Sequence, residues 1–394
     1  MLTLLSHIYR LILCIRQWLY KSGLLKTRTL PYPVICVGNL TTGGTGKTPA
    51  VIAITKILNN MDIPPQKKQV CHPEQVSGSQ MMQGQEIPET MLKQVQHKVR
   101  DDRINGSKNK QHVAILSRGY KRKSKASILI VSDGKSLLVT PEESGDEPYL
   151  IASTLKNVPV VVGGDRYKSG IYSAAHTGAK IFILDDGYQH MQLHRDINIL
   201  LIDASKPYGN GHLLPKGILR EPLNGISRAD CVIVTRANEG GKADIEVLVR
   251  KHNHHAPVFY ASYKATGITD PDGNSYDVNT IRGKKVFIFS GIANPQSFRK
   301  SIENIAGKVV GEISYPDHYW YKNDDLRKII KKASDVSAKA VITTAKDAVR
   351  LHGLDLSEKT GAEVKLLILH VEMIIDNGFT GWIQERMQEI PKRC

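Results

Sequence analysis

A glycine-rich stretch near the N-terminus has the residue types of a phosphate-binding loop. The stretch TTGGTGKT spans residues 41–48, follows the apolar run VICVGNL and precedes the helix-compatible stretch PAVIAITKIL. Such a loop turns backbone N–H groups toward a nucleotide, while a lysine reaches the β- and γ-phosphates and a hydroxyl binds Mg²⁺. The order of strand, glycine-rich loop and helix therefore predicts a nucleotide site rather than a chance glycine turn.

The loop departs at one position from the usual G-x-x-x-x-G-K-[ST] pattern, because Thr41 stands where the first glycine is expected. Gly43 and Gly44 supply backbone freedom slightly later in the loop. Lys47 takes the phosphate-binding role and Thr48 that of the Mg²⁺ ligand. The residues expected to surround the nucleotide are Thr41, Thr42, Gly43, Gly44, Thr45, Gly46, Lys47 and Thr48.

A second candidate ligand for Mg²⁺ follows the apolar run IFIL, where Asp185 and Asp186 stand side by side. Two adjacent carboxylates at the end of a buried strand are costly unless a cation or hydrogen bonds compensate them. Phosphate-loop enzymes hold Mg²⁺ with an acidic residue of this kind. Together with the loop, the pair predicts a metal–nucleotide site, and the alternative is a helix-capping aspartate beside a turn.

Three further polar stretches have no obvious structural reason: SRGYKRK at 117–123, GDEPYL at 145–150 and YPDHYWY at 315–321. Asp146 precedes a predicted helix, where a carboxylate also serves as a cap. His318 lies among aromatic residues in a predicted loop. A His–Asp pair is suited to deprotonating a hydroxyl, but spacing alone does not pair these two residues.

Short apolar runs rich in β-branched residues alternate with helix-compatible stretches from residue 34 onward. Runs that are apolar on both faces and separated by helices predict a mostly parallel sheet covered by helices. The first set comprises residues 34–37, 113–116, 128–131, 158–162, 181–184, 197–202 and 231–234, and the second comprises 258–263, 286–293, 340–344 and 366–372. The expected fold class is α/β: a P-loop NTPase-like, mostly parallel sheet with helices on both faces, plus a smaller C-terminal α/β domain.

Composition divides the chain into three parts. We expect an N-terminal amphipathic helix over 1–28, a P-loop domain over 29–252 and a smaller α/β domain over 253–394. The HNHH cluster at the second boundary favours a solvated linker over a metal site. Residues 60–110 are polar, rich in Gln, Lys, Pro and Ser, and show no sustained period, so we interpret them as a surface insertion. Its Cys71 and His72 are assigned no chemistry.

The first 25 residues, MLTLLSHIYRLILCIRQWLYKSGLL, are apolar but interrupted by Arg10, Arg16 and Lys21. The longest clean apolar run, LILCI, is far short of the roughly 20 residues that span a bilayer, and no cleavage site of a signal peptide follows. On a helix, an apolar face with Trp18 lies opposite a face that carries basic residues. This pattern favours a helix in the membrane interface over a terminal helix packed on its own domain.

The formal charge of +16 over 394 residues calls for an anionic partner, and the first 61 residues contain no Asp or Glu. The five scattered cysteines form no C-x-x-C pair, which argues against a zinc site or a disulfide framework and favours a reducing compartment. No helix-turn-helix, zinc-knuckle or aromatic–basic RNA motif is present, so nucleic acid is the weakest of the anionic partners.

Taken together, these stretches resemble those of the tetraacyldisaccharide 4'-kinases, the lipid A 4'-kinases of Gram-negative bacteria. The matching stretches, in chain order, are VGNLTTGGTGKTP, LSRGYKRK, GDEPYL, GGDRY, LDDGYQHMQLHRD, LLIDA, GNGHLLPKGILREPL, FSGIANPQSF, YPDHYWY and TTAKDAVRL. The family's loop has the form G-N-L-[ST]-x-G-G-[ST]-G-K-T, so Thr41 is a family trait. The 60–110 insertion has no counterpart in the family pattern.

The resemblance implies an ATP- and Mg²⁺-dependent kinase that phosphorylates the 4'-hydroxyl of a tetraacylated glucosamine disaccharide 1-phosphate in lipid A biosynthesis. The implied partners are this membrane-embedded substrate and the anionic surface of the inner membrane. The implied location is the cytoplasmic face of the inner membrane, reached peripherally through the N-terminal helix. Neither nucleic acid nor an obligate protein partner is inferred.

The resemblance also implies roles by motif position. Lys47 would hold the β- and γ-phosphates, Asp146 would be the general base on the 4'-hydroxyl, and His318 would support Asp146 as its dyad partner. The other implied positions are Thr48, Asp185 and Asp186 at the metal, Gln189 near the nucleotide, and Arg118, Tyr120 and Arg166 along the path of the anionic substrate.

Two other functions stay open at this point. A P-loop kinase of a soluble acceptor explains the loop and the acidic pair but leaves the N-terminal helix unused. A basic nucleic-acid-binding NTPase explains the charge of +16. Binding to DNA that falls steeply with salt would favour the NTPase, whereas detergent-dependent solubility and binding to lipid vesicles would favour the lipid kinase.

Overall fold

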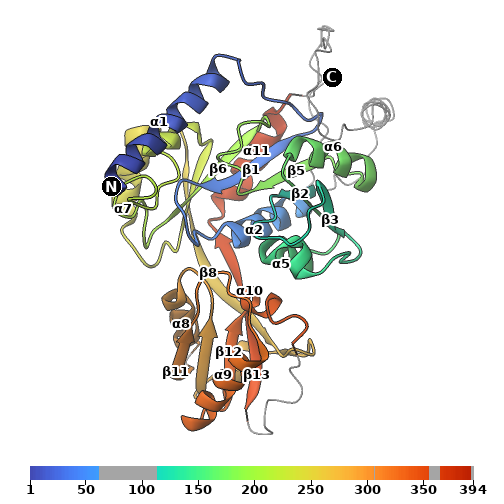
Figure 1. Cartoon of the computed structure of the whole chain (residues 1–394), viewed down its shortest axis with the longest axis vertical. Helices are drawn as coiled ribbons and strands as arrows, with labels where there is room; N and C mark the ends of the chain where they lie inside the picture. The colour runs from blue at the N-terminus through green and yellow to red at the C-terminus, as the bar shows by residue number, and fades with distance from the viewer. Residues whose placement is uncertain (62–112, 306, 355–363, 392–394) are drawn as a thin grey trace.

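Two lobes are joined by two long strands in the computed structural model, which describes residues 1–61, 113–305, 307–354 and 364–391 (Figure 1). The strands β8 (Val258–Thr269) and β13 (Lys365–Ile375) pass between the lobes. In the described part of the chain, a 13-stranded sheet has the order β11-β10-β12-β13-β8-β7-β6-β1-β5-β2-β4-β3, with β9 paired to β8. From residue 62 onward, the expected insertion at 60–110 lies outside the described residues, together with Cys71 and His72.

The upper lobe contains the phosphate loop. Its strands are β1 (Val34–Asn39), β2 (Val113–Ser117), β3 (Ile128–Asp133), β4 (Pro159–Gly163), β5 (Ile181–Asp185), β6 (Ile197–Asp203) and β7 (Cys231–Thr235). Its helices are α1 (Leu2–Lys21), α2 (Lys47–Asn60), α4 (Pro141–Ser144), α5 (Asp146–Thr154), α6 (Arg166–Thr177), η1 (Leu223–Arg228), α7 (Lys242–His252) and α11 (Gly378–Glu389). These strands pair in parallel except for β3, which is antiparallel to β4.

Alternation along β1 shows how this sheet is buried on both faces. Ile35 and Val37 belong to one core cluster with residues of α2, α5 and α11. Val34 and Cys36 point the other way, into a cluster with residues of α6 and α7. A central parallel strand with both faces covered needs apolar residues at every position, which is what the run VICV provides. The expected α/β class with a mostly parallel sheet is confirmed.

The lower lobe is a smaller α/β layer on the same sheet. Its elements are β9 (Ser275–Tyr276), η2 (Val278–Ile281), β10 (Lys285–Ser290), α8 (Pro295–Asn304), β11 (Lys308–Ser314), α9 (Asn323–Asp335), β12 (Ala340–Thr344) and α10 (Ala345–Val349), together with β8 and β13. Strands β11, β10, β12 and β13 are parallel, and β13 is antiparallel to β8. Phe298 of α8 packs on one face of this layer and Leu326 of α9 on the other.

The end of the chain returns to the upper lobe. The boundary expected at residue 253 falls just before β8, but Phe379, Ile383 and Met387 of α11 pack in the same core cluster as Ile35. The lower lobe is therefore held at both of its chain ends, through β8 on entry and through β13 and α11 on exit.

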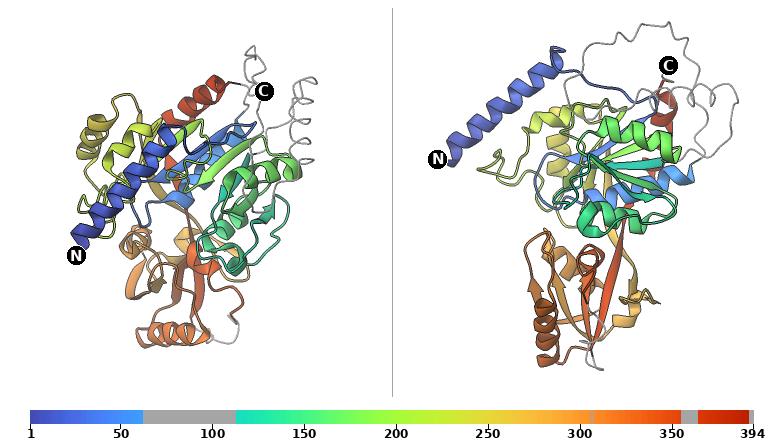
Figure 2. Two further views of the ribbon diagram at one scale, coloured as in Figure 1. Left: turned by 45° about the horizontal axis from the view of Figure 1, so that its top comes forward. Right: turned by 45° about the vertical axis from the view of Figure 1, so that its right-hand side comes forward.

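The N-terminal helix α1 lies along the upper lobe and projects beyond it (Figure 2). Ser6 is its one buried residue, and the Ser6 hydroxyl donates to the carbonyl oxygen of Leu213 over 2.9 Å. Its apolar face is solvent-exposed rather than packed on a core: Leu4, Leu5, Ile8, Leu11, Ile12, Ile15 and Trp18 are all exposed. Of the helices that the structure describes, none combines the length and apolarity needed to cross a membrane.

Candidate active site

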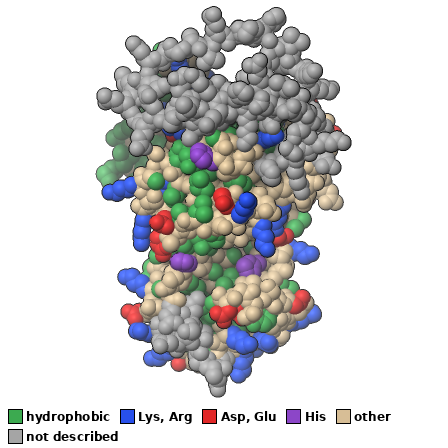
Figure 3. Space-filling view, turned by 90° about the vertical axis from the view of Figure 1, so that its right-hand side faces the viewer, with side chains coloured by type: hydrophobic (Ala, Val, Ile, Leu, Met, Phe, Trp, Pro, Cys, Tyr) green, Lys and Arg blue, Asp and Glu red, His purple; other side chains and the backbone are tan. Residues whose placement is uncertain are grey.

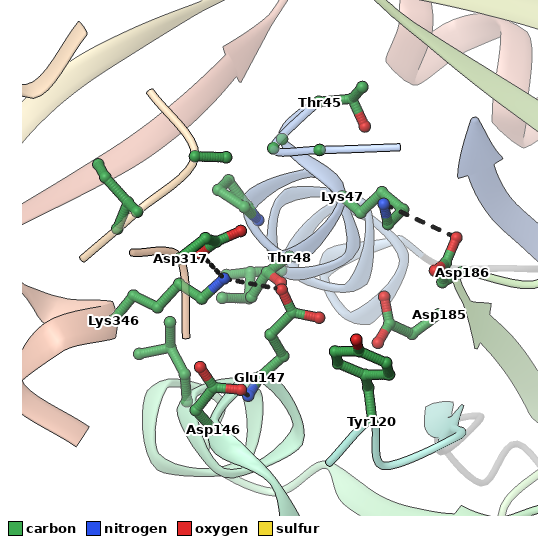
Figure 4. A pocket seen from close by; sticks show the side chains of 18 of the residues that line it. Thr45, Lys47, Thr48, Tyr120, Asp146, Glu147, Asp185, Asp186, Asp317 and Lys346 are labelled. Carbon is green, nitrogen blue, oxygen red and sulfur yellow. Dashed lines mark hydrogen bonds and ion pairs between the residues drawn. The ribbon is translucent and has the colours of Figure 1, made fainter. Parts of the chain in front are cut away.

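A cleft with a volume of about 1120 Å³ is lined by residues of both lobes. Seen from one side, hydrophobic side chains gather around the middle of the molecule, with both basic and acidic side chains beside them (Figure 3). In the close view, the phosphate loop and the acidic pair face side chains that come from α5 and from the lower lobe (Figure 4). The cleft thus brings together the polar motifs of the sequence.

The phosphate loop connects the end of β1 to the start of α2. Gly43 and Gly46 have φ values of 105° and 85°, a region that L side chains rarely adopt. A Cβ on Gly46 would lie 2.1 Å from the hydroxyl oxygen of Tyr263, so the loop has no room for a side chain there. Thr41, by contrast, forms an isolated antiparallel bridge with Leu219, which needs no glycine. The unusual threonine therefore fits the local backbone.

Side chains at the ends of β1 and β7 donate hydrogen bonds to the carbonyl groups of the loop. The Asn39 amide donates to the Thr41 carbonyl oxygen and to the Thr45 hydroxyl, both over 2.8 Å. Arg236 donates to the Gly44 carbonyl oxygen over 2.9 Å, and the Thr235 hydroxyl donates to the Thr45 carbonyl oxygen over 3.0 Å. With these carbonyls engaged by the protein, the loop can present N–H groups to an anion at the N-terminus of α2.

Lys47 and Arg220 both approach Asp186, at the end of β5. The Lys47 Nζ atom lies 3.7 Å from Asp186 Oδ1, and Arg220 Nη1 donates to Oδ1 and Oδ2 over 2.9 and 2.8 Å. Burial alone would raise the pKa of Asp186, but Lys47 and Arg220 outweigh it and lower this pKa below its usual value. Asp186 is therefore an anion whose charge the protein already balances.

Asp185 is buried with far less compensation. The Ser117 hydroxyl donates to its Oδ2 atom over 2.9 Å, while its Oδ1 atom is buried and has no hydrogen-bond partner among the residues that the structure describes. Burial, reinforced by the nearby charges of Glu147 and Asp186, raises the pKa of Asp185 to about 7. An unpartnered buried carboxylate oxygen beside a phosphate loop is the group that a divalent cation would satisfy.

The residues present fit Mg²⁺ bound together with a nucleotide. In the described part of the chain, no group of three His, Cys, Asp or Glu side chains is arranged to hold a metal ion alone. Mg²⁺, however, is usually held by one or two carboxylates plus substrate phosphates and water. Asp185, with its unpartnered oxygen, and Thr48, with its hydroxyl, line the same cleft. They could supply the few protein ligands that Mg²⁺ needs when phosphates and water supply the rest.

Asp146 and His318, which the sequence could not pair, are in direct contact. His318 Nδ1 lies 2.8 Å from Asp146 Oδ2, and the side chains are 15% and 5% exposed. Asp146 opens α5 in the upper lobe, whereas His318 belongs to the loop after β11 in the lower lobe. Burial opposes ionisation of Asp146, but the hydrogen bond from His318 and the charges of Lys346 and Arg350 lower its pKa. The carboxylate is therefore ionised at neutral pH.

A second contact between the lobes runs through Lys346. Its Nζ atom lies 3.0 Å from Glu147 Oε1 and 3.4 Å from Asp317 Oδ1 (Figure 4). Glu147 is on α5 and Lys346 on α10, so the pair joins the lobes beside Asp146. Burial opposes protonation of Lys346, but Glu147, Asp146 and Asp317 raise its pKa.

The remaining predicted site residues lie around the same cleft. Gln189 is held by its own amide, which donates to the Asn39 carbonyl oxygen over 2.8 Å and to Glu221 over 2.7 Å. Arg166 is buried and donates to the Gly164 carbonyl oxygen over 3.0 Å, and burial lowers its pKa to about 10. The predicted residues that line the cleft are Thr42, Gly43, Gly44, Thr45, Gly46, Lys47, Thr48, Arg118, Tyr120, Asp146, Arg166, Asp185, Asp186, Gln189 and His318.

Several residues of the site were not singled out by sequence reasoning. Arg220 lies in the stretch GNGHLLPKGILREPL and Arg350 in TTAKDAVRL, so both belong to matching stretches but were given no role. Arg236 follows the strand run CVIV. A basic residue at the end of a predicted strand was the one feature of the sequence that could have indicated its place in the site. Glu147 lies in the stretch GDEPYL, directly after Asp146, and was likewise given no role.

Comparison with known proteins is consistent with this geometry. The sequence model of the family described as tetraacyldisaccharide-1-P 4'-kinase matches residues 1–66 and 105–388. The residues between these ranges, 67–104, are left out of the match and fall within the stretch interpreted as an insertion.

Individual relatives give the same result. A tetraacyldisaccharide 4'-kinase of Desulfatibacillum aliphaticivorans is 37% identical, over 90% of this chain and 86% of the relative. One of Syntrophus aciditrophicus is 33% identical, over 99% of this chain and 93% of the relative. Among solved structures, the "apo" form of LpxK from Aquifex aeolicus in complex with ATP is 31% identical, with a TM-score of 0.67 and 97% of both chains covered.

Proposed function

The chain belongs to the tetraacyldisaccharide-1-P 4'-kinase family, and we propose that the cleft between its lobes is where ATP and the acylated disaccharide meet. The protein is a kinase that uses ATP to phosphorylate the 4'-hydroxyl of a tetraacylated glucosamine disaccharide 1-phosphate in lipid A biosynthesis. The observation that carries our assignment of the site is the 2.8 Å contact between His318 and Asp146, which joins residues 172 positions apart opposite the phosphate loop.

The phosphate loop would hold the triphosphate of ATP. Backbone N–H groups of residues 43–48 would surround the phosphates at the start of α2, and Lys47 would pair with the β- and γ-phosphates. Lys47 is within reach because its Nζ atom already lies in the cleft near Asp186. Arg220 would keep Asp186 in place when Lys47 turns toward the nucleotide.

Thr48, Asp185 and Asp186 would hold Mg²⁺ beside the phosphates. When bound, the ion neutralises charge that develops on the transferred phosphoryl group. The fit rests on the orphaned Oδ1 atom of Asp185, whose buried charge the protein leaves unbalanced.

Asp146 would act on the acceptor. The 4'-oxygen attacks the γ-phosphorus, the bond from this phosphorus to the β–γ bridging oxygen breaks, and ADP leaves. Asp146 takes the proton that the 4'-hydroxyl loses, as the catalytic aspartate of other kinases does. His318, in contact with Asp146 Oδ2, holds the carboxylate in orientation and shares the proton afterwards. Arg118, Tyr120 and Arg166 would line the path of the anionic substrate from the membrane side.

Helix α1 would bring this cleft to the bilayer surface. Its exposed apolar face includes Ile8, Ile12 and Trp18, while Arg10 and Lys21 are exposed. An apolar face of this kind, with basic residues beside it, suits insertion into the interface of an anionic membrane. Because Tyr9 and Arg16 of α1 are among the residues that line the cleft, the acyl chains would stay in the membrane while the sugar enters the site. We therefore propose a peripheral location on the cytoplasmic face of the inner membrane.

The catalytic assignment is tested by transfer of labelled γ-phosphate from Mg-ATP to the acylated disaccharide 1-phosphate in mixed micelles. We expect Asp146→Ala to lower kcat by about 10²–10⁴-fold, the usual contribution of a general base, with little change in the affinity for ATP. Asp324→Ala, at a highly exposed carboxylate of the lower lobe, serves as control. Equal activity of the wild type and Asp146→Ala would remove the role of Asp146, and equal transfer to a deacylated disaccharide would favour a soluble acceptor.

The membrane assignment is tested by co-sedimentation with vesicles that contain anionic phospholipid. We expect the double change Ile8→Glu and Ile12→Glu to reduce the bound fraction at least several-fold, because each change places a charge on the inserted face. The control is Val247→Glu, which alters a 70% exposed apolar residue of α7. Binding that resists the double change would show that α1 is not the membrane contact.

A further inference from the structure

A fully buried ion pair of the lower lobe lies directly behind the Asp146–His318 contact. Arg350 Nη2 donates to Asp347 Oδ1 over 2.7 Å, and both side chains are 0% exposed. The same oxygen of Asp347 accepts from the Gly291 N–H over 2.8 Å and from the Tyr321 hydroxyl over 2.6 Å. The negative charge of Asp347 therefore balances Arg350, whose guanidinium has further N–H groups to donate.

The guanidinium also lies close to both Asp146 and the backbone that holds His318. Arg350 Nη1 donates to the Gly291 carbonyl oxygen over 2.9 Å, and the backbone N–H of His318 donates to the same oxygen over 3.2 Å. The N–H at Arg350 Nε donates to the Lys346 carbonyl oxygen over 3.3 Å, and Nε itself lies 3.8 Å from Asp146 Oδ2, the atom that His318 Nδ1 also contacts. One guanidinium thus fixes the carbonyl that anchors His318 and faces the carboxylate that His318 holds.

His318 needs such an anchor because of its backbone. Its φ of 63° lies in the left-handed region, which is unfavourable for a residue with a side chain. The anchor itself is tightly enclosed, since a Cβ on Gly291 would meet the Pro316 carbonyl oxygen and the Tyr321 hydroxyl at 3.1 Å each. The surroundings of Gly291 therefore fix where the His318 backbone can sit.

Charges on every side of Asp146 come from few elements. The loop after β11 contributes His318 and Asp317, α10 contributes Lys346, the residue that caps α10 at its C-terminus is Arg350, and α5 contributes Glu147. Lys346 is already paired with Glu147 and Asp317, whereas Arg350 approaches the Asp146 carboxylate itself. Arg350 therefore combines two contacts: its Nε atom lies 3.8 Å from the Asp146 carboxylate, and its Nη1 atom donates to the Gly291 carbonyl oxygen that anchors His318.

We propose that Arg350, held by Asp347, is a positioning residue that assembles the Asp146–His318 pair across the two lobes. It does not touch either substrate; it fixes His318 through Gly291 and fixes the Asp146 carboxylate by its charge. The consequence is that the pair forms only when α10 and α5 are docked. This inference rests on the proposed role of Asp146 as the base.

The test is a double-mutant cycle on phosphoryl transfer with Arg350→Met and Asp146→Asn. We expect Arg350→Met to lower kcat by about 10- to 100-fold, as misplacement of a reacting group by a fraction of an ångström to an ångström does, with KM for ATP changed less than about threefold. In the Asp146→Asn background the same change should cost little more, because Arg350 acts through Asp146. Fully additive losses would overturn the inference, whereas an active Asp146→Asn enzyme would overturn the proposed function instead.

The pH profile separates positioning from a loss of stability. In kcat/KM, Arg350→Met should move the acid limb to higher pH, because a cation that favours ionised Asp146 is gone. The matched control is Tyr321→Phe, which removes another donor to Asp347 without reaching Asp146 and should leave the limb in place. If Arg350→Met does not fold, Arg350→Lys is the second test. This variant keeps the positive charge but loses the paired N–H donors of the guanidinium, so it should lower kcat while the acid limb stays in place. An acid limb that stays in place in Arg350→Met, or kcat unchanged in Arg350→Lys, would refute the proposal.

Discussion

Asp185 and Asp146 are almost equally withdrawn from water, at 3% and 4% exposure, and they line the same cleft. Within the described ranges of the chain, Asp185 receives one hydrogen bond, from Ser117, and has one oxygen without a partner. Asp146 contacts His318 and faces Arg350. The first carboxyl therefore has its pKa raised to about 7, while the pKa of the second is lowered.

The difference lies in where the balancing charge comes from. The lower lobe supplies cations to Asp146, so the negative charge of this carboxylate is balanced once the two lobes are docked. The protein leaves Asp185 short of a cation, although Lys47 and Arg220 balance its neighbour Asp186. A bound metal–nucleotide complex would supply what is missing. On the proposed assignment, a bound ligand would balance the charge of Asp185, whereas the folded protein itself balances the charge of Asp146.

The largest effect that this comparison predicts follows from Asp185→Asn. We expect kcat to fall by about 10³-fold, since the charge stabilisation lost with a displaced metal ion amounts to several kcal/mol. The free energy of unfolding of the metal-free protein at pH 8 should nevertheless hold or rise, because an uncompensated buried charge is removed. Phosphoryl transfer and urea denaturation in EDTA measure the two quantities.

The control for this change is Asp146→Asn, which should alter stability in the opposite direction. It leaves Arg350 facing a neutral group, and breaking a buried pair costs about 3–5 kcal/mol when one partner is left charged. The internal partner Asp347 reduces this cost for Arg350. Loss of stability of equal size in both variants would mean that the two carboxylates are balanced in the same way, and the comparison would fail.

The pH dependence of stability gives the next largest effect. Because the pKa of Asp185 is raised to about 7 on folding, its contribution to stability is complete below the ordinary aspartate pKa and is lost as pH rises through 7. In EDTA, the wild type should therefore lose unfolding free energy between pH 5 and pH 8, and Asp185→Asn should lose less. Urea titrations at these two pH values measure the difference.

Asp146 is expected to give the reverse dependence. Its pKa is lowered on folding, so its contribution is present above the ordinary aspartate pKa and is lost only as pH falls through the lowered value. Between pH 5 and pH 8 the Asp146→Asn protein should follow the slope of the wild type. A changed slope in that variant, or an unchanged slope in Asp185→Asn, would contradict the assignment of the two pKa shifts.

Sequence patterns sufficed for the parts of this molecule that depend on neighbours in the chain. The apolar run VICV predicted a strand buried on both faces, and the glycines before Lys47 predicted a loop, because both signals are local. The adjacent carboxylates at the end of β5 were found in the same way. The alternation of such runs with helical stretches was enough for the mostly parallel sheet.

Contacts between distant segments were beyond those patterns. Asp146 and His318 are 172 positions apart and meet only because the lower lobe docks on α5. In the sequence, Asp347 and Arg350 look like an ordinary i, i+3 pair on an exposed helix, so nothing local indicates that they are buried. The packing of α11 in the core of the upper lobe was also missed, because the sequence of an amphipathic helix does not indicate which core its apolar face contacts. These features are set by tertiary packing rather than by local propensity.

The smallest predicted effect concerns Ser117, the one described hydrogen-bond donor to Asp185. Ser117→Ala should lower the unfolding free energy at pH 8 in EDTA by about 1–3 kcal/mol, the cost of a lost hydrogen bond to a buried charge. At pH 5, where Asp185 is protonated, the loss should shrink toward the roughly 1 kcal/mol of a neutral hydrogen bond. Thr343→Val is the matched control, because the Thr343 hydroxyl donates over 3.0 Å to the Phe289 carbonyl oxygen, a buried acceptor that does not titrate. If the effects of Ser117→Ala and Thr343→Val varied equally with pH, the hydrogen bond from Ser117 would not depend on the charge of Asp185. The contrast between a poorly compensated Asp185 and a well-compensated Asp146 would then fail.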